Sequence, residues 1–201
     1  MLRSLPFCTD RRVRRRLPLL LTGALALALN ASPVRAQAPA ADAPATTPNT
    51  PAAPSISNED RDIMQDLAHA HHAALESARL ALEKSKSERV RQFAQQMIDD
   101  HSQAQTDLQQ LAQLKQVKLP QEASLPHKTL STAMRLLSGD MFDRQYMARM
   151  GVDDNARTVE LLQSGQKNAK DAELRALLER QLAMAETHLM VARRLNGTKS
   201  S

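Results

Sequence analysis

The sequence predicts an all-α protein built as a four-helix bundle, on three observations. Apolar residues recur at spacings of three and four along four long stretches, as on one face of an amphipathic helix. No stretch alternates apolar and polar residues in the manner of a half-buried strand. The 201 residues include only five Gly, one Tyr and no Trp, which argues against a glycine-rich nucleotide-binding fold and an aromatic-rich β-sandwich.

The first two long helices are predicted over residues 58 to about 84 and 88 to about 116. Ser57 and Asn58 are good capping residues, and Glu59 and Asp60 place acids in the first turn, where the helix dipole favours them. Ser87 is in position to cap the second helix. Its apolar face consists of Val90, Phe93, Met97, Ala104, Leu108 and Leu111.

A longer connection separates these helices from the last two. Pro120 and Pro126 bracket a loop, and a short crossover helix is predicted over residues 127–137. The third long helix is predicted from about residue 142 to 164. Gly151 within it costs roughly 1 kcal/mol relative to Ala and marks a kink or bulge. Asp171 is predicted to cap the fourth helix, which completes a four-helix bundle with a short crossover helix.

Residues 1–36 are predicted to be a signal peptide. Five arginines between residues 11 and 16 precede an apolar run over residues 17–29, and Val34 and Ala36 suit a cleavage site after Ala36. The run is shorter than the ~20 apolar residues of a membrane-spanning helix. We therefore expect an exported protein, periplasmic or associated with the envelope, with no transmembrane segment in the mature chain. The general secretory and twin-arginine routes both stay open.

The predicted organisation continues with a linker over residues 37–57, rich in Ala, Pro and Thr, a helical bundle over 58–196 and a tail over 197–201. Residues 1–36 hold seven of the 27 basic and one of the 22 acidic residues, so residues 37–201 carry a formal charge of −1. This charge argues against a nucleic-acid partner. The sequence has a single cysteine, Cys8, which rules out a disulfide framework. Cys8 is expected to leave with the signal peptide, and the mature chain is then expected to have no thiol.

Histidines on helices are the residues most able to carry chemistry. His71 is predicted near the apolar side of the first helix, and His188 faces inward on the fourth. On the second helix, Asp100 is predicted near the centre of the apolar face and His101 at its edge. Inward histidines and carboxylates on facing helices can build a metal site. They can equally form a structural hydrogen-bonded network, and the Glu-x-x-His spacing of many bundle metal sites is absent.

Several segments of the sequence resemble one family. They are LALEKS at 80–85, VRQFAQQMIDDH at 90–101, LAQLKQVKLP at 111–120, SGDMFDRQYMARMGVDD at 138–154 and QLAMAETHL at 181–189. Together with the leading signal peptide, they resemble the secreted ferritin-like domain-of-unknown-function family, whose members are often labelled putative exported or outer membrane proteins. The resemblance implies a ferritin-like bundle of four long helices and no settled activity.

The resemblance also implies inward site positions, of which this chain keeps only some. The Glu expected on the first helix falls at Ala74, and the His expected after Asp154 is Asn155, so the resemblance implies that two ligands are lost. His71, one turn before Ala74, is a candidate substitute. The metal-ligand candidates that remain are Asp100, His101, Asp154 and His188.

These observations favour a non-enzymatic periplasmic structural or binding module, with a stress-related role among the options. We assign no catalytic residue and no cofactor, and the partners are unknown. The alternative is a ferritin-like protein that binds Fe, Mn or Zn, or another divalent metal, through the inward His and Asp residues. A module that binds a membrane surface is the least supported hypothesis, because the basic residues of the bundle are interspersed with acidic residues.

Overall fold

The computed structural model describes residues 56–197. The predicted signal peptide, most of the predicted linker and residues 198–201 lie outside the described residues. Ile56, which we assigned to the linker, is buried, and the hydroxyl of Ser57 accepts a hydrogen bond from the backbone N–H of Asp60 at 3.0 Å. Packing against the bundle therefore begins before the first helix.

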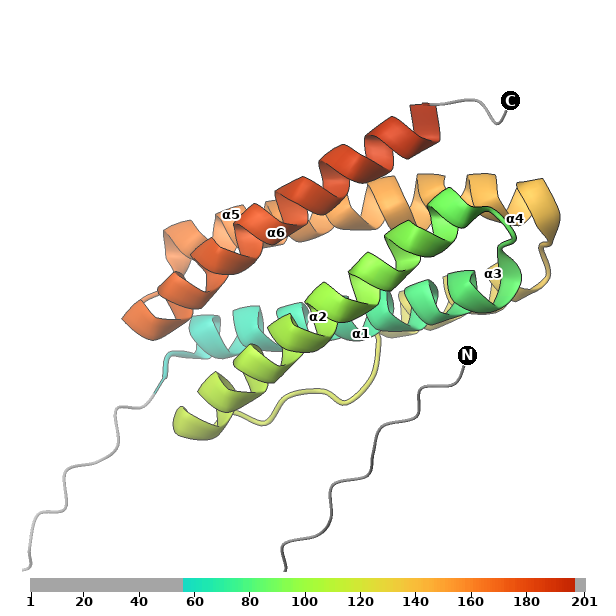
Figure 1. Ribbon diagram of the computed structural model, residues 1–201. Helices are drawn as coiled ribbons and strands as arrows, with labels where there is room; N and C mark the ends of the chain where they lie inside the picture. The colour runs from blue at the N-terminus through green and yellow to red at the C-terminus, as the bar shows by residue number, and fades with distance from the viewer. Residues whose placement is uncertain (1–55, 198–201) are drawn as a thin grey trace, which may run out of the picture. The chain divides into compact units, whose positions relative to one another are not determined.

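The described chain is helical, which confirms the all-α prediction (Figure 1). Its elements are α1 (Asn58–Lys84), α2 (Glu88–Leu114), α3 (Leu125–Arg135), α4 (Gly139–Gln145), the π-helical segment η1 (Tyr146–Asp153), α5 (Asp154–Asn168) and α6 (Ala172–Gly197). α4, η1 and α5 follow one another without a break and together form the third long helix. No helix among residues 56–197 carries an apolar stretch long enough to cross a membrane.

The long helices pack as two antiparallel pairs, α1 with α2 and α5 with α6 (Figure 1). The C-terminal end of α5 lies beside the N-terminal end of α1, because the carboxylate of Asp60 accepts hydrogen bonds from the backbone N–H groups of Lys170 and Asp171 at 2.9 and 3.1 Å. The chain between α2 and α4, which contains α3, therefore crosses over to the opposite end of the bundle. This is the long second connection that the sequence predicts.

One predicted cap is confirmed, and two predicted helices have different bounds. The side chain of Asp171 caps α6, accepting from the backbone N–H groups of Glu173 and Leu174 at 3.0 and 2.9 Å. The crossover helix begins at Leu125 rather than residue 127, because Ser124 takes the N-cap position and Pro126 fits the first turn. The third long helix starts at Gly139 and ends at Asn168, so it is longer at both ends than predicted.

Gly151 lies in η1, where the predicted irregularity takes the form of a π-helix. A Cβ atom at this position would lie 3.0 Å from Cε of Met147 and 3.3 Å from Cβ of Ala192 on α6. Glycine therefore allows the widened helix to approach α6 closely. Eight residues are in π-helical geometry, which is long for a feature that usually spans one turn and often occurs at functional sites.

The core consists of two apolar clusters with buried histidines between them. One cluster contains Leu67 of α1 and Leu108 of α2, and the other contains Ala78 of α1 and Phe93 of α2. His71 and His101 occupy the intervening positions on these two helices and are almost completely buried. The bundle therefore encloses a polar layer near its middle.

Candidate functional site

Three hydrogen bonds connect the buried polar groups of α1, α2 and α6. Nε2 of Gln181 donates to the backbone carbonyl of Ala104 at 3.1 Å. This leaves Oε1 of Gln181 to accept from Nε2 of His71, also at 3.1 Å. Nδ1 of His71 lies 3.0 Å from Nδ1 of His101. One glutamine and two imidazoles thus form a chain of hydrogen bonds, which we call the histidine relay.

Burial keeps both imidazoles of the relay neutral at pH 7. Desolvation lowers the pKa of His71 from 6.5 to about 4. Burial also lowers the pKa of His101 well below its usual value, and the neighbouring His71 and His188 lower it further. A neutral imidazole has one N–H and one bare nitrogen, so each bond in the relay has a defined direction.

The donor-to-acceptor direction of these hydrogen bonds shows which nitrogen of His101 has a free electron pair. Because Nε2 of His71 donates to Gln181, its Nδ1 is bare and accepts from Nδ1 of His101. His101 therefore has its proton on Nδ1 and an unprotonated Nε2. That Nε2 is buried and has no hydrogen-bond partner among the described residues. An orphaned buried polar atom requires an explanation, such as a bound water or ion.

A second orphaned nitrogen belongs to His188 on α6. Nε2 of His188 lies 2.8 Å from Oδ2 of Asp100, while its buried Nδ1 has no partner in the described part of the chain. The ring centroids of His101 and His188 are 5.3 Å apart. Asp100 is the exposed end of this group, with 33% of its side chain accessible. His101 is only 1% exposed, so the two residues take the reverse of the orientations predicted on the helix.

A cavity of about 290 Å³ adjoins His101. It lies among α1, α2, α3, η1 and α5. Ten of its sixteen lining residues are polar or charged, and the other six are three alanines, two methionines and a leucine, but most of the exposed lining surface is apolar. The lining residues used below are Ala74, Met97, His101, Met150, Asp154 and Asn155. Ala74 and Asn155, where the family resemblance places a Glu and a His, therefore do face the same space.

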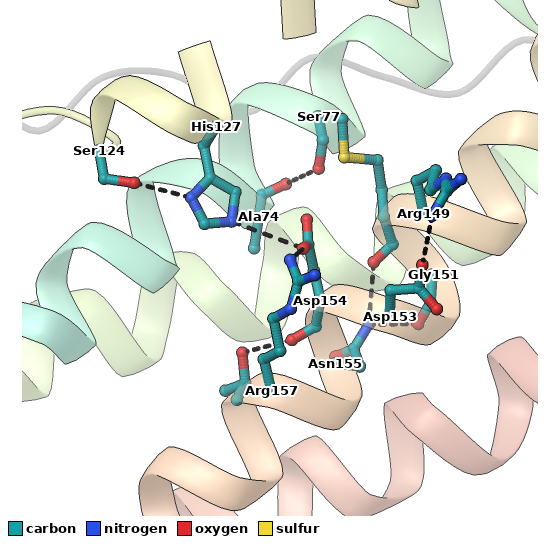
Figure 2. Close-up of polar contacts among 12 residues, drawn as sticks. Ala74, Ser77, Ser124, His127, Arg149, Gly151, Asp153, Asp154, Asn155 and Arg157 are labelled. Carbon is teal, nitrogen blue, oxygen red and sulfur yellow. Dashed lines mark hydrogen bonds and ion pairs between the residues drawn. The ribbon is translucent and has the colours of Figure 1, made fainter. Parts of the chain in front are cut away.

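Asn155 has a structural role at this wall (Figure 2). Its Nδ2 donates to the backbone carbonyl of Gly151 at 2.8 Å and lies 3.4 Å from that of Met150. A π-helix displaces carbonyl groups from the ordinary α-helical pattern, and a side-chain amide can satisfy them. The amide nitrogen of Asn155 is thus used within its own helix.

One rim of the cavity is formed by an ion pair between α3 and α5 (Figure 2). Nε2 of His127 lies 3.5 Å from Oδ1 of Asp154, and its Nδ1 lies 2.9 Å from the hydroxyl oxygen of Ser124. Asp154 also pairs with Arg157 at 3.4 Å. The contact with Asp154 raises the pKa of His127 above its usual value. Our sequence reasoning used His127 only as the start of the crossover helix, because no periodic pattern relates a residue after a loop to the cavity.

The structure divides the four predicted ligands into two sets. Asp100, His101 and His188 lie together, whereas Asp154 lies at the cavity rim with His127. Within residues 56–197, no group of three or more His, Cys, Asp or Glu side chains is arranged to hold a metal ion. His71, the suggested substitute for the lost glutamate, instead joins the histidine relay. Metal binding by the four residues remains a prediction.

By its fold and this polar layer, the described chain is a helical-bundle protein with a buried layer of histidines. Residues 45–195 match the family described as "Domain of unknown function (DUF4142)". The match covers most of the chain, and the protein belongs to this family, in agreement with the resemblance in its sequence. No curated protein matches the sequence significantly.

Solved structures of similar fold have remote sequences. A DUF305 fragment from Deinococcus radiodurans has a TM-score of 0.64 at 15% identity and covers 72% of this chain and 99% of its own. CopM in the Cu(II)-bound form has a TM-score of 0.57 at 15% identity, with 68% and 95% covered. The conserved hypothetical protein rv2844 from Mycobacterium tuberculosis has a TM-score of 0.55 at 14% identity, with 71% and 94% covered. At these identities the similarity extends to the fold alone.

Proposed function

We propose that this protein is an exported, non-enzymatic binding protein that holds a small ligand in the cavity beside His101. The observation that carries this proposal is the unpartnered, buried Nε2 of His101 at a cavity of about 290 Å³. Binding sites in proteins are typically concave and mostly apolar, with a few polar groups that orient the ligand. The signal peptide predicted at the N-terminus supports export.

The polar groups of the cavity support binding rather than conversion. The hydroxyl of Ser77 donates to a carbonyl of its own helix, the amide of Asn155 donates within its own helix, and Asp154 pairs with His127. These groups are already engaged in the structure of the bundle. The bare nitrogen of His101 is an acceptor or a metal ligand, and a ligand with a donor or a positive charge would satisfy it.

The second candidate function is metal binding, and the orphaned nitrogens of His101 and His188 favour it. Neutral imidazole nitrogens are common ligands for transition metals. CopM, which shares the fold at 15% identity, was solved with Cu(II) bound. Here a metal ion is one kind of ligand for the proposed site.

The test is native mass spectrometry of protein exported by an expression host and purified without chelators or an affinity tag. We expect a bound mass that is lost in Ala74→Leu, because the larger side chain fills the cavity. Ala176→Leu is the matched control, since residue 176 is an exposed position on α6. The same spectra measure cleavage after Ala36.

Two results would contradict the proposal. An intact leader on the exported protein would remove the signal-peptide prediction. The absence of any bound mass, or equal occupancy in Ala74→Leu and Ala176→Leu, would mean that the cavity is not a binding site. Helical circular dichroism of both variants checks that the bundle is folded.

A further inference from the structure

Two methionine side chains share the cavity wall with His101. Met97 on α2 and Met150 in η1 are 4% and 6% exposed, and both line the cavity. A buried methionine commonly serves as adaptable core filler. Here, however, the two thioethers border an open space together with His101, whose buried Nε2 has no hydrogen-bond partner within residues 56–197.

Helix geometry explains how both sulfur-bearing side chains reach the same space. Met97 precedes His101 by four residues, a spacing that places both on one face of an α-helix. Met150 precedes Asn155 by five residues, and a π-helix repeats its hydrogen bonds at a spacing of five. Met150 and Asn155 therefore lie on one face of the widened helix, as Met97 and His101 lie on one face of α2. All four residues line the cavity.

The chemistry of these donors selects a class of ligand. Thioether sulfur is a soft ligand that favours Cu(I), and imidazole nitrogen also suits copper. Hard cations such as Mg²⁺ and Ca²⁺ require oxygen ligands instead. Burial of a charge is costly, and the cost grows with the charge, so a site with neutral donors favours a monovalent over a divalent ion.

We propose that Met97, His101 and Met150 form a binding site for a monovalent copper ion, with one nitrogen and two sulfur donors. The proposal rests on the proposed function, because it uses the same cavity, and it names the ligand class. It differs from the carboxylate-containing set predicted from the sequence, since no carboxylate and no residue of α6 belongs to it.

The experiment is an anaerobic titration in which the protein competes with a chromophoric Cu(I) chelator, bicinchoninate. The exported protein is used in a Cys8→Ser background, so that the only thiol of the sequence does not compete. Met97→Leu and Met150→Leu remove sulfur and nearly conserve volume. Met64→Leu and Met147→Leu are the matched controls, because both residues are buried methionines outside the cavity lining.

We expect one Cu(I) per chain, with sulfur and nitrogen scatterers in its X-ray absorption spectrum. Each cavity variant should weaken Cu(I) binding by about tenfold or more, as loss of a ligand does in metal sites, whereas the two controls should match the parent protein. Failure to hold Cu(I) against the chelator, or equal affinity in all four variants, would overturn the proposal. So would tighter binding of Zn(II) than of Cu(I).

The outcomes separate this proposal from the proposed function. If Ala74→Leu abolishes a bound mass but the methionine variants bind Cu(I) like the controls, the copper site is refuted and the binding cavity stands. If Ala74→Leu changes no bound mass, the binding cavity itself is refuted.

Discussion

Gln181 is predicted to set the protonation of His101 through His71, and Gln181→Met is the perturbation that tests this. Methionine has nearly the length and volume of glutamine, so the packing of α6 is retained. It has neither an N–H donor nor a carbonyl acceptor. The variant therefore removes the hydrogen bonds from Gln181 to Ala104 and from His71 to Gln181 without opening a large cavity.

The expected loss of stability follows from the group that becomes orphaned. His71 is completely buried, and its Nε2–H has no other acceptor among the hydrogen bonds of the described chain. An unsatisfied buried donor costs about 1–3 kcal/mol. The imidazoles can pass the orphaned N–H on to His101, beside the cavity, by reversing the relay, so that Nδ1 of His71 donates to Nδ1 of His101. The proton of His101 then moves to Nε2, and its electron pair is no longer free.

Two assays measure these consequences. Urea denaturation followed by circular dichroism should show a lower midpoint with an unchanged slope, since the exposed surface on unfolding is the same. Imidazole ¹⁵N spectra should show Nε2 of His101 as a bare nitrogen in the parent protein and as a protonated nitrogen in Gln181→Met. Gln163→Met is the control, because residue 163 is exposed on α5.

Two outcomes would refute the reasoning. If Gln181→Met and Gln163→Met unfold at the same urea concentration, the buried amide contributes nothing to stability. If Nε2 of His101 is already protonated in the parent protein, the assigned direction of the relay is wrong.

Three further predictions concern stability. The carboxylate of Asp60 accepts hydrogen bonds from two backbone N–H groups just before α6. Asp60→Ala should therefore lower the free energy of unfolding, measured by urea denaturation, by about 2–4 kcal/mol. Equal urea midpoints for Asp60→Ala and the exposed control Asp62→Ala would contradict this. Because the pKa of His71 falls from 6.5 to about 4 on folding, unfolded His71 binds a proton in this range while folded His71 does not. His71 should therefore lower stability by about 3 kcal/mol from pH 6.5 to 4, and His101, whose pKa is also lowered, adds to this fall. A dependence on pH as steep in His71→Gln as in the parent protein would refute the contribution of His71. Asp154 raises the pKa of His127, so protonated His127 stabilises the fold below its unfolded pKa and loses this effect as pH rises through its folded pKa. His127→Gln should therefore lower the melting temperature more at about pH 5.5 than at about pH 8.5. An equal decrease at both pH values would argue against the ion pair.

Much of the fold could be predicted because its determinants are local. The caps at Ser57 and Asp171 are short side-chain-to-backbone contacts, and each involves residues within three positions. Gly151 marked an irregularity correctly, but the local sequence indicated neither its π-helical form nor the close approach of this position to Ala192 on α6. α3 begins two residues earlier than predicted, because Ser124 takes its N-cap position and Pro126 fits its first turn, whereas we had assigned both residues to the loop.

The candidate site was less predictable because it depends on how helices face one another. Adjacent residues on a helix differ by about 100° in direction, so the periodic pattern alone did not decide which of Asp100 and His101 is buried. The histidine relay needs His71 and Gln181, which are 110 residues apart. His127 reaches Asp154 only because the crossover returns over the cavity.

The π-helical segment also has a consequence for how this protein can change. A helix that gains one residue without losing its ends must rotate everything that follows by about 100° or widen locally to absorb the addition. Removal of one residue from the segment Tyr146–Asp153 would therefore restore a narrow helix and leave the same side of α5 toward the cavity. In this bundle, the widened segment can absorb a change in the number of residues at one place without exchanging the side chains that line the cavity.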